Sequence, residues 1–131
     1  MSYERYRDWF EEAIDDFEAA TELFKVGKWS KVCFLSHQAV ERVLKSLMIK
    51  ELNIYRHTHS ITELLREIIN RIEFPKELVK QASRLDRYYI PTRYPNAWPA
   101  LPPHKHYSRE DAEEALSTAK SVIEFVKKRF E

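Results

Sequence analysis

The sequence predicts an all-α protein, an up-and-down bundle of about five helices with a long proline-rich loop before the last helix. Apolar residues recur at helical spacing along most of the 131 residues, and no segment alternates apolar and polar residues as an amphipathic strand does. Gly27 is the one glycine, and five of the six prolines lie within residues 89–107. Because proline disrupts a helix and glycine often ends one, these two places separate the expected helices.

The first two expected helices are long. In residues 3–25, aromatic and aliphatic side chains from Tyr6 to Phe24 recur every three or four positions, as in an amphipathic helix. The second helix, expected in residues 31–52, has apolar residues around nearly its whole circumference. Such a belt predicts burial on both sides, and in a small bundle we expect another subunit or a ligand to supply the second side.

Capping signals indicate where the next two helices begin. Ser60 and Glu63 have the spacing of a capping box, which predicts a helix in residues 59–72. Pro75 suits the first turn of a fourth helix, in residues 75–89, because its missing N–H is not needed there.

The last helix is expected in residues 108–130. Ser108 is a suitable cap, and acidic residues in the first turn with basic residues in the last turn match the helix dipole. The chain has the length of an ordinary domain and no linker or repeat, so we expect a single domain over residues 1–131.

Composition excludes several classes of protein. With 22 basic and 21 acidic residues the net charge is +1, so any affinity for anions must come from local clustering of charge. No apolar run approaches the roughly 20 residues that cross a bilayer, so no membrane association is expected. The single cysteine, Cys33, excludes an internal disulfide and fits a reducing compartment, which predicts a cytoplasmic location.

The proline-rich loop is basic and aromatic. Residues 87–109 contain no Asp or Glu but four Arg or Lys and two His. Arginine beside aromatic rings suits a planar anionic ligand, because guanidinium pairs with phosphate and rings stack on bases. The alternative is that Tyr94 and Trp98 cap the bundle while Arg93 pairs with an acid such as Asp86.

Three polar residues, Gln38, Glu41 and Lys45, share one face of the second expected helix. Glu41 and Lys45 have the favourable i, i+4 order of an exposed pair, so one interpretation is a solvated surface. The other is the polar floor of a pocket or of a dimer interface, where a carboxylate and an ammonium beside apolar groups need each other.

Two His-x-His pairs, His57 with His59 and His104 with His106, invite a metal interpretation. Each lacks a carboxylate or cysteine close by, and zinc requires three or four ligands, so no metal ion and no cofactor is expected. His59 directly precedes Ser60, which places it at the start of the third helix, either exposed or near the occupant of the pocket.

Together these segments resemble a known family. The runs "AIDDFEAATELFKVGKWSKVCFLSHQAVERVLKSLMIKE", "HTHSITELL", "LDRYYIPTRYPNA" and "YSREDAEEALSTAKSVIEFV" are similar to the HEPN domain, named for higher eukaryotes and prokaryotes nucleotide-binding. The resemblance runs from about Trp9 to Val126. It implies a helical bundle, commonly a homodimer, often found beside a minimal nucleotidyltransferase in two-gene systems that resemble toxin–antitoxin pairs.

Carried over position by position, the resemblance implies ligand-binding roles for Gln38, Glu41, Lys45, His59, Tyr88, Arg93 and Tyr94. One departure concerns catalysis. Ribonuclease members of the wider superfamily have an arginine, four to six residues and then a histidine, and no histidine of this chain has an arginine at that distance. This argues against RNA cleavage through that motif, and no catalytic residue is assigned.

The leading hypothesis is a non-catalytic, nucleotide-binding dimer that acts with a minimal nucleotidyltransferase. In it Arg93 and Lys45 contact the phosphates of ATP or a similar nucleotide, Tyr94 or Tyr88 stacks or donates a hydrogen bond, and Glu41 orients Lys45. This requires the loop to fold over the second helix so that both line one recess.

Two other hypotheses stay open. In the first, the chain is an RNase toxin of a toxin–antitoxin-like pair with a rearranged site, in which His59, His104 or His106 is the base. Alternatively, it is an interaction module, and the loop and the polar residues only build the dimer.

Overall fold

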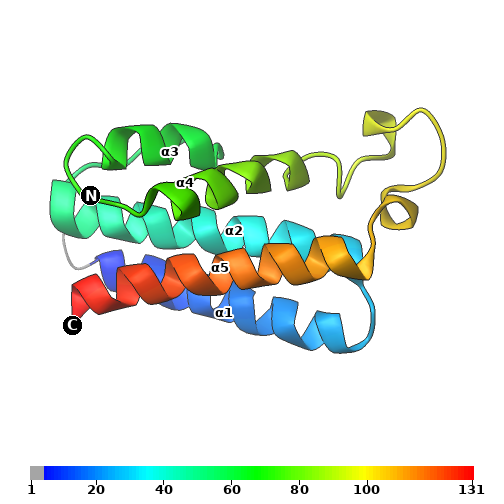
Figure 1. The fold of residues 1–131 in the computed structure, drawn as a ribbon, viewed down its shortest axis with the longest axis horizontal. Coiled ribbons are helices and arrows are strands. Elements are labelled where there is room, and N and C mark those ends of the chain that lie inside the picture. The colour runs from blue at the N-terminus through cyan, green and yellow to red at the C-terminus, as the bar shows by residue number, and fades with distance from the viewer. Residues whose placement is uncertain (1–4) are drawn as a thin grey trace.

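Three long helices form the body of the fold and run side by side (Figure 1): α1 (Arg5–Lys25), α2 (Trp29–Leu47) and α5 (Arg109–Phe130). Two shorter helices complete it: α3 (Ile61–Ile68) packs on α2, and α4 (Lys76–Ser83) packs against α3 and α5. This computed structural model describes residues 5–131, and none of these residues forms a strand. The predicted all-α bundle of about five helices is confirmed.

Helix α2 is the central element of the bundle. It packs against α1, α5, α3 and the 3₁₀ segment η2 (Arg84–Tyr88). Its apolar residues with no exposed surface are Val32, Cys33, Ala39, Val40, Val43, Leu44 and Leu47. The predicted burial on both sides is therefore confirmed. The inference that another subunit or a ligand supplies one side is wrong, because α3 and η2 of the same chain return to cover it.

Three helices end differently from the prediction. Helix α3 ends at Ile68, whereas the third helix was expected to reach Ile72. The last turn of α2 widens into a π-helical turn, η1 (Met48–Leu52), which ends at Asn53 with a positive φ of 55°. Asparagine tolerates this left-handed conformation better than most residues. The expected fourth helix ends at Ser83 and continues as η2, whose tighter winding is common at the ends of helices.

The proline-rich loop projects beyond one end of the bundle (Figure 1) and is held by its own side chains. It contains two short 3₁₀ turns, η3 (Pro95–Ala97) and η4 (Pro103–His106). Trp98 donates a hydrogen bond from Nε1 to the Pro91 carbonyl at 2.7 Å, and its ring stacks on His106 with centroids 3.8 Å apart. Trp98 therefore braces the loop itself, which is a different role from capping the bundle.

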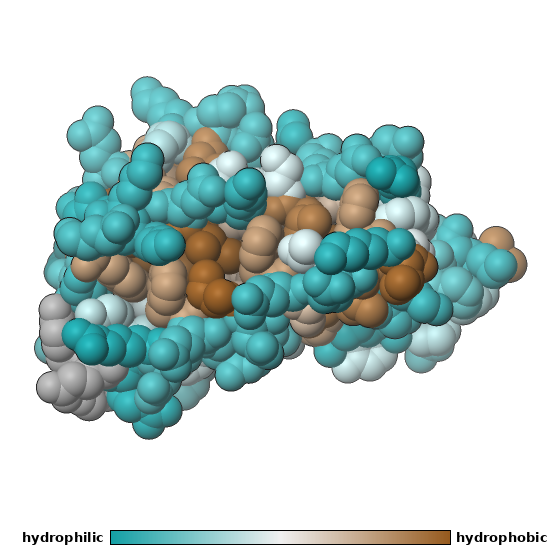
Figure 2. Space-filling view, turned by 90° about the horizontal axis from the view of Figure 1, so that it is seen from below, coloured by the Kyte–Doolittle hydropathy of each residue, from teal (hydrophilic) through white to brown (hydrophobic). Residues whose placement is uncertain are grey.

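Apolar side chains also gather on the face that α1 and α5 form (Figure 2). There Phe17, Phe24 and Leu116 help to line a recess of about 400 Å³. Within residues 5–131, no helix has both the length and the hydrophobicity required to traverse a lipid bilayer. The polar residues singled out in the sequence lie around α2 instead.

Candidate functional site

Glu41 and Lys45 form a buried ion pair on α2. Their side chains are 8% and 3% exposed, and Lys45 Nζ lies 2.9 Å from Glu41 Oε2. The ammonium also lies over the rings of Trp9 and Tyr55, at 5.6 and 5.2 Å from their centroids, where a cation is attracted to the ring face. The interpretation as a solvated surface pair is therefore wrong, because residues from α1 and from the segment after α2 cover this face.

His59 stands at the outer side of this pair. Its Nδ1 lies 3.2 and 3.3 Å from the two carboxylate oxygens of Glu41, while its side chain is 58% exposed. Because an ionised carboxylate only accepts hydrogen bonds, Nδ1 carries the proton, and in the neutral ring Nε2 is then free to accept. The His59 ring stacks on Tyr89 with centroids 4.8 Å apart. The structure thus holds an exposed imidazole between a buried carboxylate and an aromatic ring.

Arg93 continues this series of contacts into the proline-rich loop. Its Nε donates a hydrogen bond to the Tyr89 carbonyl at 2.9 Å, and its guanidinium lies 4.4 to 5.0 Å from the ring centroids of Phe34, Tyr89 and Tyr94. The alternative pairing of Arg93 with Asp86 is absent from the described part of the chain, where both carboxylate oxygens of Asp86 bond elsewhere.

The loop and α2 therefore do meet on one side of the molecule. Contacts run from Arg93 to Tyr89, then to His59, Glu41 and Lys45. Arg93 and Lys45 lie at the two ends of this series: the guanidinium is exposed, and the ammonium is closed off by the chain itself.

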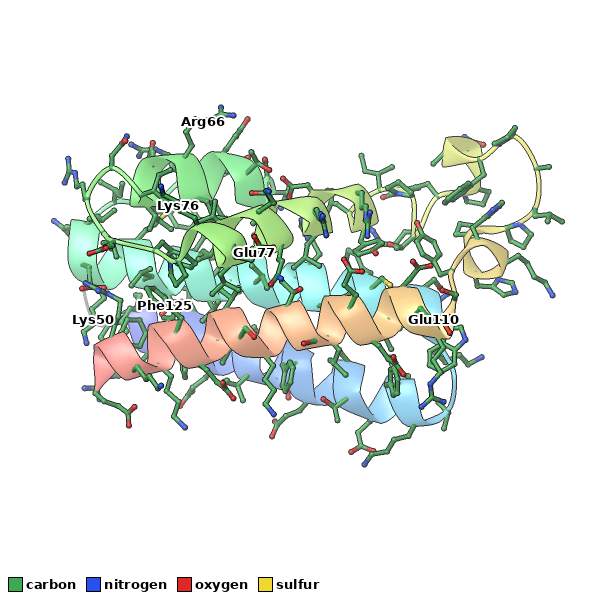
Figure 3. All side chains as sticks on the ribbon, viewed as in Figure 1. Lys50, Arg66, Lys76, Glu77, Glu110 and Phe125 are labelled. Carbon is green, nitrogen blue, oxygen red and sulfur yellow. The ribbon has the colours of Figure 1, made fainter. Side chains whose placement is uncertain are left out.

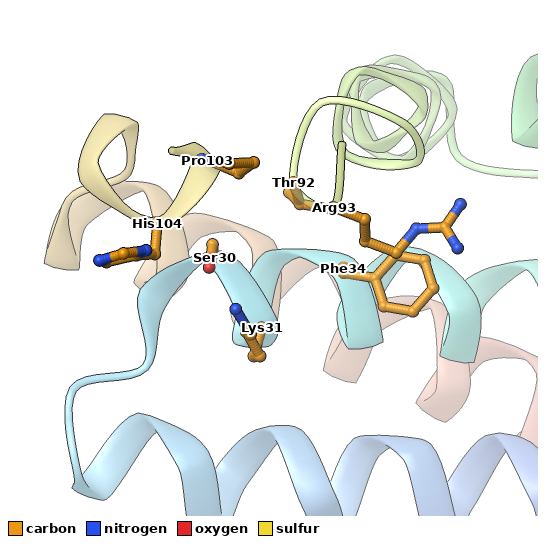
Figure 4. Close-up of a pocket in the computed structure, with 7 residues that line it drawn as sticks. All are labelled: Ser30, Lys31, Phe34, Thr92, Arg93, Pro103 and His104. Atoms are coloured by element: carbon orange, nitrogen blue, oxygen red, sulfur yellow. The ribbon is translucent and has the colours of Figure 1, made fainter. Parts of the chain in front are cut away.

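A recess lies where Arg93 crosses the first turns of α2 (Figure 4). We call it the loop–helix recess; its volume is about 330 Å³, and it is lined by Ser30, Lys31, Phe34, Thr92, Arg93, Pro103 and His104. None of these residues is acidic, and Lys31, Arg93 and His104 can all carry positive charge. Apolar side chains together with a few polar groups, around a cavity of this volume, are typical of small-ligand sites.

Of the seven predicted site residues, Arg93 is the one that lines this recess. Tyr88 and Gln38 also lie outside the series of contacts from Arg93 to Lys45. Tyr88 is 4% exposed and accepts a hydrogen bond from Arg87 at 2.8 Å, and its burial raises the pKa of its hydroxyl. Gln38 is half-buried and lies near Asp16 of α1, whose carboxylate bonds to Arg42. The structure brings His59, Arg93 and Tyr94 to the open side of the cluster, whereas Tyr88 belongs to the core.

Asp86 is a positioning residue that the sequence did not reveal. It accepts the backbone N–H groups of Ile61 and Thr62, at 2.7 and 3.0 Å, and the hydroxyl of Ser60 at 3.1 Å. It also faces the buried His37, whose Nε2 lies 3.2 Å from Oδ1. Burial raises the pKa of Asp86, but the hydrogen bonds from His37 and Thr62 outweigh it and hold this pKa well below the usual range. Asp86 thereby fixes the start of α3, which directly follows His59 and Ser60.

Lys31 and Phe34 are the recess residues that could have been found in the sequence. They extend the face of Gln38, Glu41 and Lys45 towards the start of α2 at spacings of three and four residues. His104 had no such signal, because only the folded loop brings it to α2. Within residues 5–131, no three or more His, Cys, Asp or Glu side chains are grouped to hold a metal ion.

Comparison with known proteins agrees with this architecture. The sequence model of the HEPN domain matches residues 6–129. A protein of Methanocaldococcus jannaschii, named "Putative toxin MJ1304", is 29% identical over 124 residues, which cover 88% of this chain and 81% of that protein.

Solved structures give the same result. TT1696 from Thermus thermophilus is 40% identical, with a TM-score of 0.89 over 95% of this chain and 97% of its own. ST0689, an archaeal HEPN homologue, is 30% identical, with a TM-score of 0.80 over 100% of both chains. The HEPN domain protein tm0613 from Thermotoga maritima is 28% identical, with a TM-score of 0.74 over 94% of this chain and 97% of its own. The chain belongs to the HEPN domain family.

Proposed function

We propose that this HEPN protein binds a nucleotide in the loop–helix recess without transforming it. The observation that carries the proposal is that Lys31, Arg93 and His104 line one recess with Phe34, over whose ring the Arg93 guanidinium lies, and that no residue of this lining is acidic. Cationic groups beside an aromatic surface match the phosphate and the base of a nucleotide.

The roles of two lysines differ from those expected from the sequence. Lys45 is engaged with Glu41 beneath two aromatic rings, so its ammonium supports the site indirectly. Lys31 takes its place beside Arg93 as the phosphate contact, and Tyr94, which is 51% exposed, offers a ring to the base. Glu41 orients His59 through the hydrogen bond to Nδ1, and His59 stacks on Tyr89, whose ring also contacts the Arg93 guanidinium.

Calorimetric titration with ATP, GTP and their mono- and diphosphates tests the proposal. Arg93→Ala is expected to weaken binding by about tenfold or more, the scale of one charge-assisted hydrogen bond. Arg66→Ala is the matched control, since Arg66 is exposed on α3, far from the loop (Figure 3). The proposal fails if millimolar nucleotide produces neither heat nor a shift in melting temperature.

We also propose a homodimer and a partner protein. Ile90 and Tyr94, 52% and 51% exposed, give the loop an apolar surface next to Arg93 that suits a second subunit. Sedimentation measures this association. If the protein is only an interaction module, Arg93→Ala breaks the dimer and no nucleotide binds.

The proposed partner is a minimal nucleotidyltransferase, tested by co-purification with the product of the neighbouring gene.

RNA cleavage by a toxin is the second candidate function. The exposed imidazole of His59, backed by the buried Glu41 carboxylate, is arranged as a general base is, and the M. jannaschii relative carries the name of a toxin. Expression in cells is then expected to arrest growth, with RNA cleavage lost in His59→Ala and in Arg93→Ala. Normal growth and intact RNA on expression of the wild-type protein would remove this candidate.

A further inference from the structure

We infer that the ligand is a nucleoside polyphosphate whose phosphate chain lies at the N-terminus of α2. This inference rests on the proposed nucleotide-binding function and adds the position of the phosphates and the class of nucleotide.

A second recess adjoins the first at the start of α2. Its volume is about 370 Å³, and Lys28 and Trp29 help to line it. Ser30, Lys31 and His104 line both recesses, so the two meet at these three residues. A ligand that enters the loop–helix recess beside Arg93 can therefore extend past the first turn of α2.

The helix terminus at this junction has unused hydrogen-bond donors. The first backbone bond of α2 runs from the Val32 N–H to the Lys28 carbonyl at 3.0 Å, so the N–H groups of Trp29, Ser30 and Lys31 precede the helical ladder. Lys28, at the cap position, makes no side-chain capping bond, and the first turn contains no acid. Free N–H groups and the positive end of the helix dipole together favour a phosphate.

Ser30 provides independent support. Its side chain is 1% exposed, and Oγ has no hydrogen-bond partner. Buried hydroxyls are nearly always paired, because leaving one unpaired destabilises the protein. Figure 4 shows this hydroxyl between His104 and the nitrogen end of Lys31. A phosphate oxygen at the junction is an acceptor to which the hydroxyl can rotate and donate.

The charges indicate more than one phosphate. Arg93 lines the loop–helix recess, Lys28 lines the second recess, Lys31 and His104 line both, and no lining residue of either recess is acidic. Because these cations are spread over two adjoining recesses, we expect a chain of two or three phosphates to contact more of them than a single phosphate does. Because two or three phosphates carry more negative charge than one, they also match this local excess of positive charge better.

The test is a calorimetric series with adenosine, AMP, ADP and ATP. We expect affinity to rise about fivefold or more with each added phosphate in the wild-type protein, as each gains charge-assisted hydrogen bonds. Lys31→Ala is expected to reduce this gain. Ser30→Ala is expected to weaken ATP binding about fivefold while the melting temperature stays the same or rises, a combination that a purely structural serine does not give. Lys76→Ala, on α4 at the other end of the bundle (Figure 3), is the control.

A calorimetric titration with inorganic tripolyphosphate distinguishes the failure of this inference from the failure of the proposed function. Equal affinity for AMP and ATP, with no effect of Ser30→Ala, overturns the inference and leaves nucleotide binding intact. Tripolyphosphate binding as tightly as ATP overturns nucleotide recognition, because the base then contributes nothing. If neither ligand binds, both claims are wrong.

Discussion

Glu41 and Lys45 are charged residues in the interior, and each stabilises the other there. Their nitrogen and oxygen atoms are 2.9 Å apart, and both side chains are almost fully buried. Replacing one of them leaves the other charge buried without its partner, which costs far more than the loss of a surface pair.

Glu41→Leu is therefore expected to lower the free energy of unfolding by about 3 kcal/mol, since Lys45 loses its counter-charge. The double variant Glu41→Leu/Lys45→Met is expected to recover most of this, because apolar side chains of similar volume fill the same space. Urea unfolding measures both. Glu113→Ala, which removes an exposed pair with Arg109, is the control and is expected to cost about 0.5 kcal/mol. An equal cost for Glu41→Leu and the control would contradict the buried pair.

At the scale of elements, Asp86 joins η2 to the N-terminus of α3. Its carboxylate accepts bonds from two backbone N–H groups and two hydroxyls of residues 60–62 and from His37. These bonds require the ionised carboxylate, which is why its pKa lies below the ordinary value.

Asp86→Asn is expected to lower the free energy of unfolding by about 2 kcal/mol near neutral pH, the scale of lost hydrogen bonds to a charged group. Because the folded-state pKa is depressed, this stabilisation is complete above the ordinary carboxyl pKa, about 4, and is lost as pH falls through the folded-state pKa. Unfolding measured from pH 7 to pH 2 checks the sign: the wild type and Asp86→Asn converge at low pH. Asp15→Asn, exposed on α1, is the control, and a gap that widens on acidification would refute this role.

The proline-rich loop is expected to depend on Trp98 as a unit. Trp98→Ala removes the bond to Pro91 and the stack on His106, so amide hydrogen exchange in residues 91–107 is expected to accelerate while α2 and α5 keep their protection. Tyr94→Ala, in the same loop but half-exposed, is expected to leave exchange unchanged. Equal exchange in both variants would show that the loop is held by other contacts.

At the scale of the whole molecule, helical periodicity and capping signals predicted the fold. They also predicted that α2 is buried on both sides, but they could not say by what. The spacing of apolar residues shows which faces of a helix are buried. It carries no information about which later segment of the chain packs on those faces. For that reason the sequence suggested a second subunit where α3 and η2 of the same chain pack.

For the same reason, only part of the site could be predicted from the sequence. The absence of acids around Arg93 and the polar face that contains Glu41 can both be seen in short stretches of sequence. In the structure both belong to the series of contacts from Arg93 to Lys45. Lys45 is buried because Trp9 and Tyr55, from other segments of the chain, cover its ammonium. Lys45, which was predicted to contact phosphate, is therefore paired with Glu41 instead. His104 reaches the recess only through the course of the loop.

The seven lining residues of the recess come from one chain, so nucleotide binding is expected not to require the proposed dimer. Ile90→Asn, which adds no charge beside Arg93, should disrupt association through the loop and change nucleotide affinity by less than about threefold, or 0.7 kcal/mol. Sedimentation and titration of the same samples check this, with Ile69→Asn as the control, since Ile69 is 48% exposed at the C-terminal end of α3. Parallel loss of dimer and affinity would mean that the partner subunit completes the site.

The most direct measurement is a nuclear magnetic resonance titration of the ¹⁵N-labelled protein with ATP. If the recess is the nucleotide site, the largest shift changes fall on the amides of Ser30, Lys31, Phe34, Arg93 and His104, and they disappear in Arg93→Ala. Changes confined to the apolar face of α1 and α5, or no change at millimolar ATP, would contradict the account.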